Sequence, residues 1–154
     1  MTSLPGTHCH LCFDEVGQCT CDAPHAAFDY ENPTFALPPG SELGDHFVVG
    51  PMIAKGGFGL IYRGMQTNLG RKVAIKEFCP GRLSTREGVN VVPLKEREES
   101  FYKYRELFFN EGPILGHINH KNVVAVYDFV KANNTGYLVM EYLSGTTTDN
   151  MVLP

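Results

Sequence analysis

Short hydrophobic runs, separated by turns rich in glycine and asparagine, dominate the chain from His46 onward. Five of them have the length and the β-branched content of strands: residues 46–54, 60–66, 72–78, 123–130 and 137–142. In Lys72–Phe78 (KVAIKEF) successive side chains alternate between two faces, as the two-residue period of a strand requires. Tight turns join most of these runs, among them Asn133-Asn134-Thr135-Gly136, so the pattern predicts an antiparallel, curved sheet.

One helical pattern interrupts the strands. Within Glu98–Leu115, five positions recur at intervals of three and four residues and therefore share one face: Phe101, Tyr104, Phe108, Glu111 and Leu115. A carboxylate in such a stripe either pairs with a cation, for which Lys76 is the natural partner, or reaches solvent from the edge of the stripe. Because Pro113 follows closely, we expect one of two outcomes. Either the helix ends or kinks near Glu111, or the Lys76–Glu111 pair is poorly held. The pattern as a whole predicts an α+β fold, a five-stranded antiparallel curved sheet with one main helix.

Composition divides the chain into three zones. Residues 1–25 are rich in cysteine and histidine. Residues 26–45 carry several prolines without sustained periodicity and are expected to be a linker. Residues 46–154 are expected to form the folded domain.

Charge and hydropathy exclude several classes of function. The 154 residues are 43% hydrophobic and 19% charged, with a formal net charge of −4, which excludes disorder throughout. No basic face of the kind that binds nucleic acid is visible, so nucleic acid is not an expected partner. No apolar run approaches the roughly 20 residues of a membrane helix, and the N-terminus lacks the pattern of a signal peptide. We therefore expect a cytoplasmic, reducing location and no membrane segment in this chain.

Four of the five cysteines lie close together near the N-terminus: Cys9, Cys12, Cys19 and Cys21. Cys-x2-Cys followed by Cys-x-Cys supplies four soft ligands in two short loops, which suits a tetrahedral structural Zn²⁺ site. A segment this short and this poor in apolar residues could fold only around the metal. The alternative, unligated thiols in a flexible tail, stays open. One residue between two cysteines leaves the chain little freedom to bring both to the same ion, and the two pairs are close in sequence.

The order of the elements in the third zone carries a resemblance. The expected elements follow one another in a fixed order. The first strand leads through the turn Lys55-Gly56-Gly57-Phe58-Gly59 into a second strand, which is followed by the strand Val-Ala-Ile-Lys ending at Lys76. The helix with Glu111 and a hairpin ending in Met-Glu-Tyr come next. Over about residues 41–147 this resembles the N-terminal lobe of the protein kinase family. The forms KGGFGLIYRG and VAIKEF are most similar to bacterial kinases of the eukaryotic-like serine/threonine type.

The resemblance implies that ATP binds to this lobe. Lys76 would hold the α- and β-phosphates and Glu111 would fix its direction, while the glycine-rich turn would bring backbone N–H groups to the phosphates beneath Phe58. Hydrophobic side chains would line the adenine pocket, and the backbone of Glu141 and Leu143, in the connecting segment called the hinge, would bind the base. The ATP-binding positions implied in this way are Ile53, Ala54, Lys55, Gly56, Gly57, Phe58, Gly59, Ile61, Ala74, Lys76, Met140, Glu141 and Leu143.

Departures from the family pattern bear on activity. Ala54 stands where the family has its first loop glycine, and neither His-Arg-Asp-x-x-x-x-Asn nor Asp-Phe-Gly, which supply the base and hold Mg²⁺, follows in the chain. We therefore expect a kinase N-terminal lobe truncated just after the hinge and inactive alone, with Mg²⁺ and the protein substrate bound only in the complete enzyme. The alternative is a non-catalytic zinc-knuckle and kinase-like module with a binding or regulatory role.

Overall fold

The computed structural model describes residues 8–15, 17–21, 28 and 30–143. The ends of the expected cysteine-rich segment (1–7 and 22–25), the first residues of the expected linker (26, 27 and 29) and the stretch after the hinge (144–154) lie outside the described residues.

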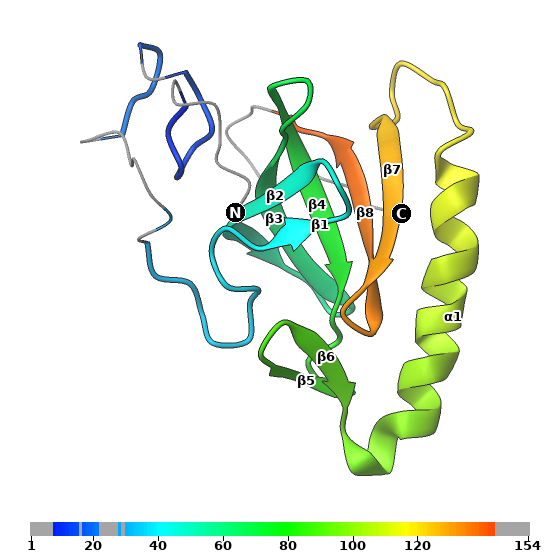
Figure 1. Ribbon diagram of the computed structural model, residues 1–154. Coiled ribbons are helices and arrows are strands. Elements are labelled where there is room, and N and C mark those ends of the chain that lie inside the picture. The colour runs from blue at the N-terminus through cyan, green and yellow to red at the C-terminus, as the bar shows by residue number, and fades with distance from the viewer. Residues whose placement is uncertain (1–7, 16, 22–27, 29, 144–154) are drawn as a thin grey trace.

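A six-stranded antiparallel sheet forms the centre of the molecule, and one long helix lies along it beside β7 and β8 (Figure 1). In spatial order its strands are β1 (Glu42–Leu43), β2 (Phe47–Lys55), β3 (Gly59–Gln66), β4 (Arg71–Phe78), β8 (Thr135–Glu141) and β7 (Val126–Ala132). The remaining elements are the hairpin of β5 (Ser84–Glu87) and β6 (Asn90–Pro93), the 3-10 turn η1 (Lys95–Arg97) and the helix α1 (Glu98–Leu115).

The predicted class, an α+β fold with a curved antiparallel sheet and one main helix, is confirmed. The sheet has one strand more than the five expected, because the two-residue β1 pairs with the start of β2. The turn between β7 and β8 shows why the hairpin signal was reliable. Ala132 pairs with Thr135, and the two residues between them, Asn133 and Asn134, both have positive φ (56° and 60°), as a type I′ turn requires.

Helix α1 continues through Pro113 and does not end near Glu111. Pro113 lies in the last turn, so only two residues of the helix follow it. The preceding Gly112 is buried, and a Cβ there would lie 2.4 Å from the ring of Phe129 on β7, so glycine allows the helix to approach the sheet closely. Of the expected stripe, Phe101 is buried, whereas Glu111 is exposed and so lies at its edge.

The segment expected as a linker packs onto the sheet over residues 30–43. Ala36, Leu37 and Leu43 belong to the main hydrophobic core. The backbone N–H of Leu37 donates to the hydroxyl of Tyr62 on β3 (3.0 Å), which fixes the segment to the sheet through a polar contact as well.

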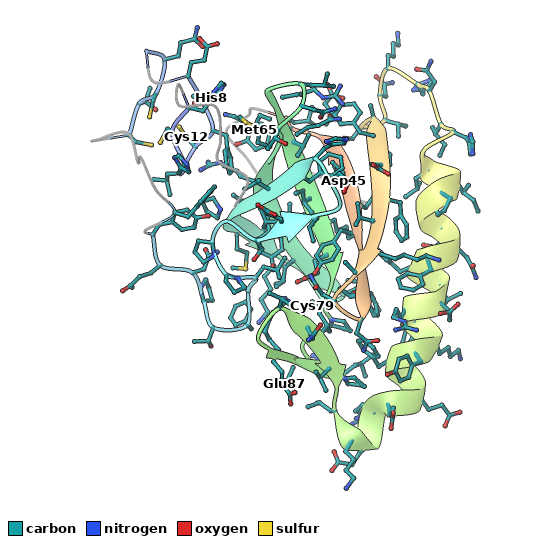
Figure 2. The ribbon with its side chains drawn as sticks, in the orientation of Figure 1. His8, Cys12, Asp45, Met65, Cys79 and Glu87 are labelled. Carbon is teal, nitrogen blue, oxygen red and sulfur yellow. The ribbon has the colours of Figure 1, made fainter. Side chains whose placement is uncertain are left out.

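A buried ion pair joins this region to the hairpin. Glu77 on β4 is fully buried, and its carboxylate accepts hydrogen bonds from the guanidinium of Arg86 on β5 and from the hydroxyl of Tyr62. Arg86 Nε donates to the carbonyl of Phe35 (2.9 Å). Cys79, which Figure 2 shows where β4 leads into the hairpin, is buried next to the pair. One guanidinium therefore ties together β4, the hairpin and the segment 30–43.

Candidate functional site

Antiparallel pairing aligns several of the predicted site positions across the sheet. Ala54 lies opposite Ile61, Ile61 opposite Lys76, and Lys76 opposite Leu138. Directly paired residues project from the same face of a sheet. Lys76 therefore shares a face with Ala54 and Ile61, and this is the face on which Phe108 and Leu115 of α1 pack.

An apolar surface surrounds Lys76 on this face. Ala74 pairs with Met140, and a buried cluster forms with further hydrophobic side chains packed against it. From the predicted ATP-binding positions the cluster includes Ile53, Ala54, Ile61, Ala74 and Met140. The cluster therefore gives this face an apolar surface against which a flat aromatic base could pack.

The hinge follows directly from Met140. The backbone N–H of Glu141 donates to the carbonyl of Ala125 (2.8 Å), so only the carbonyl of Glu141 could accept a hydrogen bond from a base. Leu143 is 48% exposed and is the last residue of the chain that the structure describes.

Lys76 is half-buried and forms none of the ion pairs found among the described residues. Burial lowers the pKa of Lys76, and the nearby charge of Glu111 opposes that shift. The two groups are therefore close enough for their charges to interact, but no contact within 4.0 Å joins these two described side chains. The ammonium of Lys76 remains available to an anionic ligand.

The glycine-rich turn (residues 55–59) connects β2 to β3. Gly56 N–H donates to the carbonyl of Gly59 (2.9 Å), which closes the turn. A Cβ at Gly57 would meet nothing within 4 Å, and one at Gly56 would meet only the Gly59 carbonyl at 4.0 Å, so this part of the backbone is open to a ligand. At Gly59 a Cβ would lie 2.1 Å from the carbonyl of Glu77, so this glycine is needed for the approach of β3 to β4.

The side chains of the turn contact neighbouring elements. The ring of Phe58 is 58% exposed and lies with its centroid 5.5 Å from that of Tyr104 on α1. The ammonium of Lys55 lies 4.5 Å from the centroid of the Phe35 ring, in the segment 30–43. Both side chains therefore contact elements outside the turn.

The four N-terminal cysteines form a compact cluster, called the cysteine cluster below. The Sγ atoms of Cys9, Cys12, Cys19 and Cys21 all lie within 4.8 Å of one another. The Sγ–Sγ distance is 3.5 Å for Cys12 and Cys19 and 4.0 Å for Cys9 and Cys21. A tetrahedral zinc ion with Zn–S bonds of about 2.3 Å needs sulfur atoms roughly 3.8 Å apart, so both distances suit the ion. They are far too long for disulfide bonds of about 2.05 Å.

The backbone supports the same arrangement. The N–H groups of Leu11 and Cys21 point at the sulfur atoms of Cys9 and Cys19 (3.5 and 3.4 Å), where they would stabilise thiolate charge. Burial raises the pKa of the Cys12 thiol. Without a counter-charge the Cys12 thiol would thus stay neutral, and a divalent cation would favour the thiolate it binds.

Motif reasoning missed two side chains next to the hinge. Tyr142 accepts a hydrogen bond from Arg63 Nε (3.1 Å), and the ammonium of Lys72 lies 4.9 Å from the centroid of the Tyr142 ring. Lys72 also pairs with Asp14, beside the cysteine cluster. No local pattern connects positions this far apart in the chain, so only the folded structure reveals the contact.

The chain matches the family described as the protein kinase domain over residues 47–153. It belongs to the protein kinase family. Among curated kinases, it is 31% identical over 109 residues to a probable serine/threonine-protein kinase of Streptomyces coelicolor. It is 28% identical over 113 residues to a probable serine/threonine-protein kinase of Clostridium acetobutylicum. These matches cover 68% and 73% of this chain but only 14% and 15% of the two relatives.

A solved structure agrees with this kinase assignment. The apo form of PpkA-294 superposes with a TM-score of 0.68 at 30% sequence identity, over 75% of this chain and 42% of that one. The family match begins at Phe47, the first residue of β2, so the cysteine cluster and the segment 30–43 lie outside it. No helix in the described part of this kinase chain is long and apolar enough to cross a membrane.

Proposed function

We propose that this chain is the ATP-binding N-terminal lobe of a serine/threonine protein kinase. The observation that carries the proposal is the position of Lys76. Its half-buried ammonium, outside every ion pair of the described residues, lies on the same face as Ala54 and Ile61, which stand on either side of the glycine-rich turn. A cation beside an apolar surface and a glycine backbone suits a nucleoside triphosphate.

Each part of the site has a role in this proposal. The apolar cluster around Ala74 and Met140 receives the adenine, and the backbone of the hinge binds the edge of the base. Lys76 binds the α- and β-phosphates as a point charge, and the charge of Glu111 on α1 acts on it without a direct contact. In the complete enzyme the γ-phosphoryl group passes from ATP to a serine or threonine hydroxyl of a protein substrate.

The residues that hold Mg²⁺ in the family, in Asp-Phe-Gly and at the end of the catalytic loop, do not occur among these 154 residues. No step through the metal is therefore assigned to this chain. The proposed role of the chain is to bind and orient the nucleotide, and by itself it transfers no phosphoryl group.

The test is a comparison of ATP with adenosine. Lys76→Met should weaken ATP binding about tenfold or more, because it removes the charge that meets the phosphates, and should change adenosine binding by less than about twofold. Isothermal titration calorimetry at millimolar ligand measures both affinities. Lys95→Met, at an exposed lysine of η1, is the matched control and should change neither. Equal losses for the two ligands would overturn the role given to Lys76.

We propose in addition that Cys9, Cys12, Cys19 and Cys21 hold a structural Zn²⁺ ion. Four sulfur donors at tetrahedral spacing, two of them approached by backbone N–H groups, support this choice of metal. Reduced thiols are needed for the site, so the proposed location is the cytoplasm.

A further inference from the structure

The cysteine cluster is packed onto the kinase lobe through Phe13. This residue follows Cys12 and is only 2% exposed, and its ring packs against Met65 of β3. Figure 2 shows Cys12 and Met65 on the same side of the sheet. A Cβ at Gly50 of β2 would lie 2.3 Å from the Phe13 ring, so the ring occupies a space that only glycine leaves open. The fit between Phe13 and Gly50 makes this a specific contact.

A polar path leads from the same loop to the hinge. Asp14 forms an ion pair with Lys72 of β4, and the two side chains are 38% and 22% exposed. The Lys72 ammonium lies 4.9 Å from the centroid of the Tyr142 ring, which is within cation–π range. Tyr142 follows Glu141 directly and is also held by Arg63 Nε. Two contacts therefore separate the cysteine cluster from the segment proposed to bind adenine.

The loop that carries these contacts is strained at Phe13. This residue has a positive φ of 63°, which is unfavourable for a residue with a large side chain. Backbone hydrogen bonds flank it, from the Phe13 N–H to the Cys9 carbonyl (2.9 Å) and from the Cys9 N–H to the Asp14 carbonyl (2.9 Å), and the Glu15 carbonyl accepts two more from Gln18 and Cys19 (2.8 and 2.9 Å). Neutral thiols form only weak hydrogen bonds, whereas a metal would join both cysteine pairs by strong bonds.

We propose that Zn²⁺ in the cysteine cluster makes residues 8–15 and 17–21 a clamp on β2, on β3 and on the hinge. The ion keeps the loop in the conformation that presents Phe13 to Gly50 and Met65, and Asp14 to Lys72. Through Lys72 the clamp restrains Tyr142, so the metal stabilises the hinge segment of the nucleotide site. This inference rests on the proposed zinc site and extends it to a positioning role for Asp14 and Lys72.

The test compares the zinc-loaded and the metal-stripped 154-residue chain by hydrogen–deuterium exchange, with zinc content measured by mass spectrometry. Removal of zinc with EDTA should speed exchange about tenfold at the end of β3 near Met65 and at residues 139–142, while exchange in the middle of α1 stays within about twofold. Cys19→Ser should lose the zinc and reproduce the stripped pattern. Cys79→Ser, which changes a cysteine outside the cluster, should keep the zinc.

Two further variants separate metal binding from docking. Asp14→Asn should keep the zinc and yet speed exchange at residues 139–142, because only the ion pair to Lys72 is lost. Glu15→Gln, at the exposed neighbouring carboxylate, is the matched control and should change neither quantity. Phe13→Ala should keep the zinc and speed exchange near Met65.

The clamp is overturned if the chain binds no zinc after reconstitution. It is equally overturned if zinc binds but its removal leaves exchange near Met65 and at residues 139–142 unchanged. ATP titration of the same samples reports on the nucleotide site separately. A chain that shows the zinc-dependent exchange but no ATP binding would support the clamp and overturn only the nucleotide function.

Discussion

Gly57 and Gly59 belong to the same turn but serve different purposes. The sequence pattern assigns both to phosphate binding. The surroundings of Gly57 are empty, which agrees with that assignment, whereas Gly59 lies against the backbone of β4, where a Cβ would come within 2.1 Å of a carbonyl oxygen. Glycine at position 59 is therefore required by strand packing, whether or not a nucleotide is bound.

This difference predicts that a glycine-to-alanine substitution destabilises the protein at position 59 but not at position 57. Gly59→Ala should lower the free energy of unfolding by about 1–3 kcal/mol, because β3 or β4 must shift to admit the methyl group. Gly57→Ala should change it by no more than about 0.5 kcal/mol, since the added methyl group meets only solvent. Urea unfolding followed by circular dichroism measures both. Equal losses of stability would contradict the packing role of Gly59.

At the scale of elements, a buried charge pair anchors the hairpin β5–β6 to β4. Arg86 reaches from β5 to the fully buried carboxylate of Glu77 and also donates to the carbonyl of Phe35. Breaking a buried pair by removing one partner leaves the other charge desolvated and uncompensated. The hairpin and the segment 30–43 therefore share a single polar anchor on β4.

Arg86→Met should lower the free energy of unfolding by about 3–5 kcal/mol, because the Glu77 carboxylate loses its counter-charge. The double variant Glu77→Leu/Arg86→Met should regain part of this loss, since no buried charge is then left unpaired. Arg82→Met, at an exposed arginine before the hairpin, is the control. Thermal or urea unfolding measures the three effects. A single variant as stable as the control would show that the pair contributes nothing.

The same elements show how far the sequence could predict the fold. Strands with regular alternation and a helix with three-and-four spacing were predicted close to their observed bounds, since these patterns are local. The hairpin β5–β6 was missed because its anchor, Arg86 on Glu77, is a tertiary contact without a periodic signature. Of the alternatives expected from Pro113, the early end of α1 does not occur: Gly112 packs on Phe129, and this contact holds the helix to the sheet beyond Glu111.

Some residues of the candidate site could likewise be predicted from the sequence, and others could not. Motif spacing predicted Lys76, Ala74 and the glycine-rich turn, and strand register places the first two in adjacent rows of one face. It could not predict the exposure of Glu111, which depends on how α1 is rotated against β7. Nor could it find the contacts of Asp14 and Tyr142 with Lys72, which join three separate parts of the chain.

At the scale of the whole molecule, the chain contains the proposed nucleotide-orienting half of a kinase site. Lys76 and the glycine-rich turn can meet an ATP molecule from one side, but the catalytic base and the metal-binding motifs do not occur in these 154 residues. Ligand pockets normally bury most of the ligand surface. ATP should therefore bind with a dissociation constant on the order of millimolar, roughly −4 kcal/mol.

It follows that the 154-residue chain should not transfer phosphate from ATP to a general protein substrate. Positioning and electrostatics supply nearly all of the catalysis in phosphoryl transfer, so a site without the base and the metal ligands has no means of stabilising the transition state. A radiolabelled γ-phosphate assay with Mg²⁺ should give the rate of the buffer control, with a complete kinase as the positive control. Turnover that Lys76→Met abolishes would refute this, because it would mean that residues of this chain alone complete the site. Turnover unaffected by Lys76→Met would instead indicate a contaminating kinase, and the assay would be repeated on protein freed of it.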